Sequence, residues 1–203
     1  MKHKIKIYYC EEIPEQISQH SLAYLLLEEM LKRNFPEEAY SMFLHGHPKY
    51  ARTMQGKPYL EDFPEIQFNI SHCPACVACA IGTEPAGVDV ERRFPWKETL
   101  VRRVCHPKER EVLEGLKNPE EKQACLNRIW SRKESYLKYL GIGLRCDLRE
   151  FCVLEPEMVH LEDCCFLELQ TDRFTLAACG RDGSRMEVEK IDFSLLKPGN
   201  DGV

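Results

Sequence analysis

The chain has 203 residues, 43% hydrophobic and 30% charged, a composition typical of a globular protein with a substantial core. Its net charge of −5 argues against general nucleic-acid binding. No apolar run approaches the roughly 18 residues that cross a bilayer, and no long apolar stretch follows the basic start as in a signal peptide. We therefore expect a cytoplasmic protein without a membrane segment, in which the eleven cysteines are mostly reduced.

The first part of the chain begins with a strand-like pattern at residues 4–10. Residues 15–35 have the periodicity of an amphipathic helix that ends before Pro36, and residues 56–66 are rich in turn-forming residues. Three short strands follow at residues 66–72, 75–82 and 86–91. Their close spacing predicts an antiparallel meander.

The second part of the chain has a similar order of predicted helices and strands. Residues 107–116 read as a short helix, and residues 118–141 form the clearest helical pattern in the chain. Asn118 is a good N-cap, Pro119 suits the first helical position, and Gly141 suits a left-handed C-cap. Strands are expected at residues 150–155, 164–170, 174–181 and 185–193.

Both parts thus predict a helix followed by an antiparallel meander. The expected fold class is α+β, with a duplicated unit divided into residues 1–96 and 97–203. No sequence repeat supports the duplication directly.

A cysteine cluster, "CPACVAC", places Cys73, Cys76 and Cys79 at repeated C-x-x-C spacing. This spacing is compatible with a zinc or iron–sulfur module. The alternative is a buried strand in which cysteine acts as a small apolar residue. On one continuous strand Cys73 and Cys79 would face one side and Cys76 the other, which is poor geometry for three ligands.

Carboxylates form the second notable pattern. Asp89 and Glu91 share one face of the predicted strand in "GVDVERRF". On the strong helix, Trp130, Glu134 and Lys138 fall on one face, so Glu134 could reach the two strand carboxylates. Taken alone, Glu134 and Lys138 would be an ordinary surface ion pair.

Three clustered carboxylates need a counter-charge, and oxygen ligands favour Mg²⁺ or Mn²⁺. Magnesium sites of this kind usually also bind substrate phosphates. Candidate phosphate-binding groups are Lys57, Ser71, His72, Lys133 and Lys138. The pattern indicates phosphoryl transfer or pyrophosphate cleavage, and another Mg²⁺-dependent phosphohydrolase remains an alternative.

The motifs also carry a family resemblance. The chain resembles Sfp-type 4′-phosphopantetheinyl transferases in "GVDVE" (87–91) and "WSRKESYLK" (130–138). Two flanking blocks, "GKPYL" (56–60) and "FNISH" (68–72), match in the same order. The resemblance covers about residues 50 to 145, and four motifs in order are far more specific than any one of them.

The resemblance implies a reaction and a metal site. Phosphopantetheine would pass from coenzyme A to a serine of an apo acyl or peptidyl carrier protein, and adenosine 3′,5′-bisphosphate would leave. Asp89, Glu91 and Glu134 would hold the magnesium ion on the pyrophosphate. Glu134 would take the serine proton, directly or through a metal-bound water. Lys138 would contact the pyrophosphate and protonate the departing phosphate.

The resemblance also implies the coenzyme A contacts and the architecture. The expected coenzyme A residues are Arg52, Lys57, Pro58, Ser71, His72, Lys133 and Lys138. Lys133 is expected either on phosphate or in structural support, and Trp130 is expected to pack its helix against the strand that bears Asp89. Arg52 is proposed for the 3′-phosphate, although no motif anchors it. Members of the family are pseudo-twofold monomers with the active site between the halves.

The resemblance does not name the carrier protein. Acyl carriers of fatty-acid synthesis and carriers of polyketide or nonribosomal peptide assembly all fit. Because such carriers are often acidic, the basic residues between Arg92 and Arg103 are a docking hypothesis. Surface decoration is the alternative.

Overall fold

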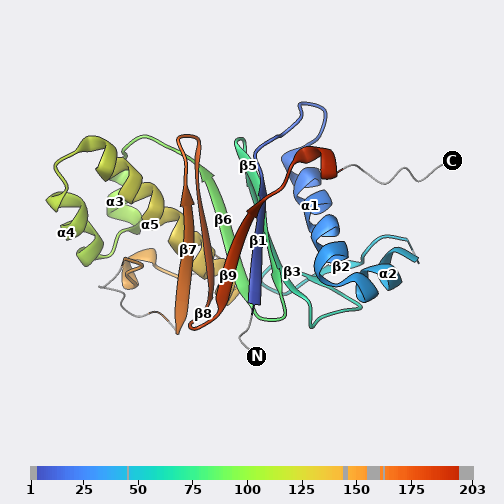
Figure 1. Cartoon of the computed structure of the whole chain (residues 1–203). Helices are drawn as coiled ribbons and strands as arrows, with labels where there is room; N and C mark the ends of the chain where they lie inside the picture. The colour runs from blue at the N-terminus through green and yellow to red at the C-terminus, as the bar shows by residue number, and fades with distance from the viewer. Residues whose placement is uncertain (1–3, 45, 144–145, 155–160, 162, 197–203) are drawn as a thin grey trace.

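The computed structural model describes residues 4–44, 46–143, 146–154, 161 and 163–196. Figure 1 shows strands in the middle of the molecule, with α1 and α2 on one side and α3, α4 and α5 on the other. The α+β class expected from the sequence is therefore confirmed. No helix in these ranges is long and apolar enough to cross a membrane.

The elements of the first part are β1 (Lys4–Cys10), α1 (Gln19–Asn34), α2 (Pro36–Leu44), β2 (Tyr50–Arg52), β3 (Pro58–Leu60), β4 (Gln67–Cys73), β5 (Cys76–Gly82) and β6 (Ala86–Arg92). Those of the second part are α3 (Glu98–Val104), α4 (Pro107–Gly115), α5 (Pro119–Leu140), the 3₁₀ turn η1 (Leu148–Glu150), β7 (Cys164–Gln170), β8 (Phe174–Arg181), β9 (Arg185–Lys190) and the 3₁₀ turn η2 (Phe193–Leu195).

The strands form two main sheets and a small β2–β3 ribbon. The larger sheet has the order β4-β5-β1-β9, in which only β1 and β9 run parallel. The smaller sheet, β6-β8-β7, is antiparallel throughout. The two sheets share one pairing pattern. In the larger sheet β1 pairs with β5, the second strand of the β4–β5 hairpin, and in the smaller sheet β6 pairs with β8, the second strand of the β7–β8 hairpin.

Three apolar cores hold these layers together. One lies between α1, α2 and the larger sheet, and a second lies between the remaining helices and the smaller sheet. The third joins the two sheets face to face through small and β-branched side chains, including Ala78, Ala80, Val88 and Ala178. Small residues at this interface let the two sheets approach closely.

The antiparallel meanders predicted from the sequence are wrong about which strands are neighbours. β4 and β5 form the predicted hairpin, but β6 leaves them and pairs with β8, while β9 crosses to pair with β1. The change from one sheet to the other therefore falls between Gly82 and Ala86. Strand partners depend on contacts distant in sequence, which local spacing does not report.

Other differences are local. The expected strand at residues 150–155 is wrong where it is described: it begins in the turn η1 and continues as coil with one bridge at Cys152. Two short helices, α2 and α3, were not expected. The helix expected from residue 15 begins at Gln19, because the Ser18 side chain caps it by accepting from the Ser21 N–H at 3.0 Å.

Helix α5 matches its prediction closely. The Asn118 side chain caps its start by accepting from the Glu120 N–H at 2.8 Å. Gly141 ends the helix with φ of 71°, in the left-handed region that favours glycine. These two caps fix the length and register of the helix that carries Glu134 and Lys138.

The cysteine cluster divides between two cores. Cys73 and Cys76 lie opposite each other in the register of the β4–β5 hairpin, and both face the core between the sheets. Cys79 instead faces the core under α1. The expected grouping of Cys73 with Cys79 is wrong because the chain reverses between residues 73 and 76. All eleven cysteines are free thiols, and burial raises the pKa of Cys73, Cys76 and Cys79.

Candidate active site

A cleft of about 450 Å³ opens where β4 and β6 run side by side beneath α5 and the start of α1. Its lining residues are His20, Tyr24, Arg52, Pro58, Ile70, Ser71, His72, Asp89, Val90, Glu91, Glu134 and Lys138. The cleft therefore brings together eight of the ten residues proposed from the sequence. The other two, Lys57 and Lys133, are not among the residues that line it.

Side chains of β4 join the two sheets at the floor of the cleft. The Asn69 Oδ1 accepts from the Val88 N–H at 2.9 Å, and the Ser71 Oγ accepts from the Val90 N–H at 3.2 Å. These N–H groups lie on the edge of β6 that no strand covers, so the side chains replace a missing ladder partner. The two bonds fix the position of β6 relative to β4.

Lys138 closes a polar network over this junction. Its Nζ donates to Asp89 Oδ1 at 2.8 Å, to Ser71 Oγ at 2.9 Å and to the Val88 carbonyl at 3.1 Å. Asp89 is only 3% exposed, so its ion pair with Lys138 is largely shielded from water. The pair is thus more than the ordinary surface contact that spacing alone would suggest.

Two carboxylate oxygens in the cleft have no hydrogen-bond partner among the described residues. Asp89 Oδ2 and Glu134 Oε1 are buried without a hydrogen-bond donor. Burial, together with the neighbouring charge of Asp89, raises the pKa of Glu134 to about 7. Burial and the charge of Asp89 also raise the pKa of Glu91.

These unpartnered oxygens fit a cation. Asp89, Glu91 and Glu134 offer oxygen donors of the kind that Mg²⁺ and Mn²⁺ prefer. The pKa values of Glu91 and Glu134 are raised first by burial and then by neighbouring negative charge, which a cation would offset. In the described part of the chain no three His, Cys, Asp or Glu side chains form a ready ligand set. The carboxylates therefore line one cleft without converging on a single point.

Trp130 contributes to the site by holding Glu91. Its indole Nε1–H donates to Glu91 Oε1 at 3.3 Å, and this bond favours the ionised carboxylate. Trp130 was expected to pack α5 against the strand that bears Asp89. The structure adds a direct polar contact with the second carboxylate on that strand.

Gly87 allows α5 to lie directly on β6. A Cβ at this position would lie 2.0 Å from the Ser135 carbonyl oxygen and 2.4 Å from the Tyr139 nitrogen. Both atoms belong to the backbone of α5 and cannot swing aside as a flexible side chain would. Only glycine permits this close approach, which brings Glu134 and Lys138 to the level of Asp89.

Lys133 points away from the cleft into the core of the second part. Its side chain is fully buried, and its Nζ lies 3.0 Å from Glu109 and 2.6 Å from the carbonyls of Leu148 and Phe151. Burial lowers the pKa of Lys133, and the charge of Glu109 opposes that shift. Of the two expected roles, the contacts describe structural support and not phosphate binding.

Arg52 and Pro58 line the end of the cleft that belongs to the first part. Arg52 donates to the Gly56 carbonyl at 3.0 Å. Lys57, which follows Gly56 in the chain, reaches the end of α5. Its Cδ lies 3.3 Å from the position that a Cβ would take if Gly141 carried a side chain. Burial lowers the pKa of Lys57.

His20 and Tyr24 are lining residues that sequence reasoning missed. The His20 ring lies edge-on to both Tyr24, at 5.0 Å between ring centroids, and His72, at 6.0 Å. Their i,i+4 spacing on α1 was visible, but nothing local indicated that the start of α1 would meet the end of β4.

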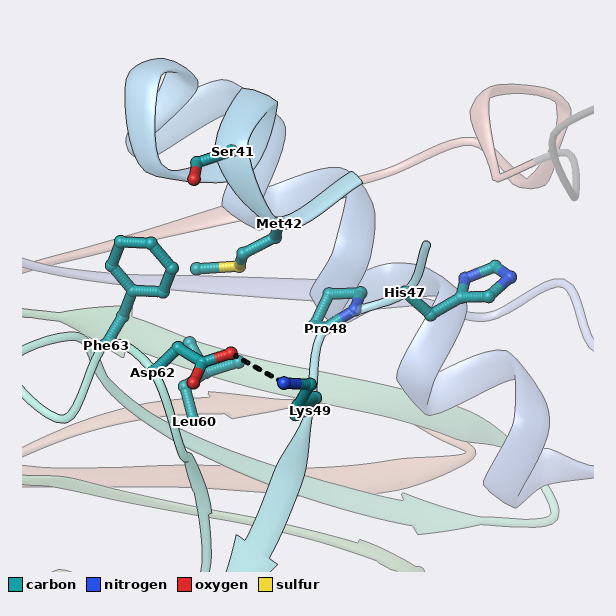
Figure 2. Close-up of a pocket in the computed structure, with 8 residues that line it drawn as sticks. All are labelled: Ser41, Met42, His47, Pro48, Lys49, Leu60, Asp62 and Phe63. Atoms are coloured by element: carbon teal, nitrogen blue, oxygen red, sulfur yellow. Dashed lines mark ion pairs between the residues drawn. The ribbon is translucent and has the colours of Figure 1, made fainter. Parts of the chain in front are cut away.

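A second, smaller cavity lies elsewhere, between α2 and the β2–β3 ribbon (Figure 2). Its volume is about 250 Å³, and Lys49 and Asp62 face each other across it at 3.6 Å. None of the residues proposed from the sequence lines it. Because these opposite charges already balance each other, it is a weaker candidate for an anionic ligand.

Comparison with known proteins finds a matching family and several similar proteins. The sequence pattern of the 4′-phosphopantetheinyl transferase superfamily matches residues 85–189, which is 105 of the 203 residues. A 4′-phosphopantetheinyl transferase of Bacillus subtilis is 29% identical over 76% of this chain and 72% of its own length.

Two further relatives match over shorter stretches. The transferase Sfp of Bacillus subtilis strain 168 is 31% identical over 63% of this chain and 56% of its own length. The transferase HetI of a Nostoc species is 38% identical over 49% of this chain and 44% of its own length. The aligned region thus spans about half the length of these two relatives. The chain belongs to the 4′-phosphopantetheinyl transferase superfamily.

Proposed function

We propose that this chain transfers 4′-phosphopantetheine from coenzyme A to a serine of an apo acyl or peptidyl carrier protein. The observation that carries the proposal is the cleft in which Asp89, Glu91, Glu134 and Lys138 come together with Ser71 and His72. Family membership and the names of the relatives support the same reaction.

The reaction exchanges one phosphorus–oxygen bond for another. The serine oxygen bonds to the phosphorus nearest the pantetheine, and the bond from that phosphorus to the bridging pyrophosphate oxygen breaks. Adenosine 3′,5′-bisphosphate leaves with the electron pair of the broken bond. The chain must therefore accept the serine proton and balance negative charge that shifts onto the leaving group.

Glu134 is the proposed proton acceptor. Without a bound cation, its pKa of about 7 makes it a stronger base than an ordinary carboxylate and still leaves a substantial ionised fraction at neutral pH. If Glu134 also held a cation it would be a weaker base, and the serine proton would then reach it through a water molecule. Glu134 and Lys138 lie one turn apart on α5, so the base and a cation face the substrate from the same rigid element.

Lys138, Ser71 and His72 are the proposed pyrophosphate contacts. Lys138 and Ser71 are already hydrogen-bonded to each other, and Asp89 orients the lysine. Asp89, Glu91 and Glu134 would hold Mg²⁺, or Mn²⁺, which supplies positive charge to the pyrophosphate when bound. Pro58 and Lys57 are proposed on the adenine side, where the cleft meets the first part of the chain.

The proposal includes the duplicated architecture. The shared pairing pattern of β1-β5-β4 and β6-β8-β7 supports two related α+β units with the active site between them. The halves expected at residues 1–96 and 97–203 fit this pattern better if β6 opens the second unit. We propose a monomer that acts in the cytoplasm, and its eleven free thiols suit a reducing compartment.

A mass measurement tests the reaction. The protein is incubated with coenzyme A, Mg²⁺ and a panel of apo acyl and peptidyl carriers, and the intact mass of each carrier is recorded. We expect the phosphopantetheine increment on at least one carrier and none on the same carrier with its acceptor serine changed to alanine. A folded protein that modifies no carrier in the panel would contradict the proposal, as would hydrolysis of coenzyme A without transfer.

A further inference from the structure

A pair of thiols closes the β4–β5 hairpin. Cys73 ends β4, Cys76 begins β5, and the turn Pro74–Ala75 joins them, so the register places Cys73 directly opposite Cys76. Residues opposite each other in antiparallel strands have their Cα atoms about 4.5–5.5 Å apart and their side chains on one face. Because most disulfides span about 4.4–6.8 Å between Cα atoms, this backbone already has the spacing that a disulfide needs.

The turn treats the two sulfurs differently. Burial raises the pKa of the Cys73 thiol, and hydrogen bonds to its sulfur from the backbone N–H groups of Ala75 and Cys76 oppose that shift. The Cys76 thiol instead donates to the Val77 carbonyl at 3.4 Å. Since N–H donors stabilise a thiolate, and the thiolate is the nucleophilic form, Cys73 is the better attacking sulfur of the pair.

Cys73 is also the more accessible of the two thiols. It is 5% exposed, whereas Cys76 is fully buried. The residues on either side of Cys73, His72 and Pro74, are exposed, and His72 lines the cleft. A small oxidant from solvent therefore meets Cys73 first, at the edge of the candidate active site.

A second pair of thiols provides a comparison within the same chain. Cys164 and Cys179 share a hydrogen bond between β7 and β8. Cys164 lies opposite Arg181 and Cys179 lies opposite Phe166, so these two cysteines are diagonal neighbours. Diagonal neighbours are roughly 7–8 Å apart, which is further than the Cα spacing of most disulfides. Contact between thiols therefore does not by itself give this second pair the backbone geometry of the first.

We propose that Cys73 and Cys76 are a modification site, a dithiol that a peroxide converts into a reversible disulfide beside the cleft. The Cys73 sulfur attacks one oxygen of hydrogen peroxide, the O–O bond breaks, and a sulfenic acid forms while the other oxygen leaves as water. The Cys76 sulfur then attacks the Cys73 sulfur, the S–O bond breaks, and a second water leaves. The two thiols lose two electrons to the peroxide, and each thiol proton ends in one of the two waters.

Reversal of this bond requires a thiol reductant. Two thiol–disulfide exchanges return both cysteines to thiols and leave the reductant as a disulfide. In a reducing compartment, disulfides of this kind are usually transient and serve catalysis or redox sensing. The inference concerns the hairpin alone and does not depend on the proposed transfer reaction.

Peptide mapping by mass spectrometry tests the proposal on the full chain. The folded, reduced protein is treated with hydrogen peroxide at mildly alkaline pH, which favours the thiolate, and the remaining thiols are then alkylated in denaturant. We expect the peptide that carries Cys73, Cys76 and Cys79 to lose two hydrogens and to be alkylated at Cys79 alone. Treatment with dithiothreitol before alkylation should restore an alkyl group at all three positions.

Two variants sharpen this test. Cys76→Ser leaves Cys73 without its partner, so peroxide should add oxygen to Cys73 and remove no pair of hydrogens. Cys164→Ala is the matched control, and it should form the Cys73–Cys76 disulfide as the wild-type protein does. The proposal is overturned if Cys73 and Cys76 both stay open to alkylation in the folded wild-type protein, or if either pairs with another cysteine. It is also overturned if Cys164 and Cys179 link instead, or if the Cys73–Cys76 bond forms only in urea-unfolded chain.

Discussion

Glu134 is under two opposing demands at the scale of a single residue. As a buried carboxylate with an unpartnered oxygen, it destabilises the folded chain whenever it is ionised. In its proposed roles as a base or a metal ligand, it must be ionised. Burial, and after it the neighbouring charge of Asp89, raises the pKa of Glu134, and a proton or a cation relieves this strain.

Glu134→Gln should therefore separate stability from activity. The folded-state pKa of about 7 lies above the ordinary value of 4.5, so the favourable contribution of protonated Glu134 is complete below pH 4.5 and is lost as pH rises through 7. Relative to wild type, the variant should gain thermal stability between pH 5.5 and pH 8.5 without added metal, while losing at least about a hundredfold in transfer rate.

Thermal unfolding at the two pH values, beside a transfer assay, checks this prediction. Glu111→Gln, at an exposed position on α4, is the control and should follow the wild-type pH profile. A stability difference between wild type and Glu134→Gln that stays constant from pH 5.5 to pH 8.5 would rule out the raised pKa.

At the scale of elements, Gly87 decides how closely α5 lies on β6. Gly87→Ala should destabilise the fold by about 2 kcal/mol or more, because its Cβ would collide with the α5 backbone. Transfer should fall further than stability alone explains, since the helix that carries Glu134 and Lys138 is pushed outward.

Urea unfolding and transfer rates measure both effects. Gly115→Ala, at the end of α4 with open space around it, is the control and should change stability by less than about 1 kcal/mol. Equal behaviour of the two alanine variants would show that the close approach of α5 to β6 is unimportant.

The buried Lys133–Glu109 pair ties α5 to α4. Glu109 also accepts from the N–H groups of His106 and Val153, both at 2.8 Å, so one carboxylate holds three segments. Lys133→Met should cost about 3–5 kcal/mol, because it leaves Glu109 buried and charged without an opposite charge beside it. Adding Glu109→Gln should recover part of that loss, since no buried charge then remains.

Urea unfolding of the single and double variants measures this coupling. Lys117→Met, at an exposed position, provides the baseline for removing a lysine charge. A Lys133→Met protein within about 1 kcal/mol of wild type would return Lys133 to the phosphate-binding role that the sequence left open.

Local signals predicted some of these elements and missed others. The ends of α5 were predictable because Asn118 and Gly141 act on their own helix. The partner of Lys133 was not, because Glu109 lies on another helix and only packing brings the two together. The same reason explains why the pairing of β6 with β8 was missed, whereas the β4–β5 hairpin was predicted.

The motifs predicted that Asp89, Glu91, Glu134 and Lys138 would lie together, and all four line one cleft although they come from two different elements. His20 was missed because no motif surrounds it, and its place in the cleft depends on how α1 packs on the larger sheet.

At the scale of the whole molecule, the cleft lies where strands of the two main sheets meet, β4 from one and β6 from the other. Arg92 is exposed and Arg93 half-buried, directly after Glu91 in the chain. Reversing their charge with Arg92→Glu and Arg93→Glu should raise KM for an acidic carrier several-fold and leave kcat nearly unchanged, because attraction between opposite charges assists encounter.

Steady-state transfer kinetics at two salt concentrations check this docking prediction. Arg185→Glu, on β9, is the control and should leave KM for the carrier near the wild-type value. If the Arg92 and Arg93 variants leave KM for the carrier unchanged at low salt, these residues are surface decoration and carrier docking uses another face.

The most direct test of the central claim compares wild type with Asp89→Asn in the transfer of phosphopantetheine to an apo carrier, followed by intact mass. Asp89 orients Lys138 and supplies an unpartnered oxygen, while asparagine keeps its shape without its charge. We predict complete modification by the wild-type protein and a loss of at least about a hundredfold in the variant, with unfolding transitions that show both proteins folded. Near-normal transfer by Asp89→Asn would contradict the account.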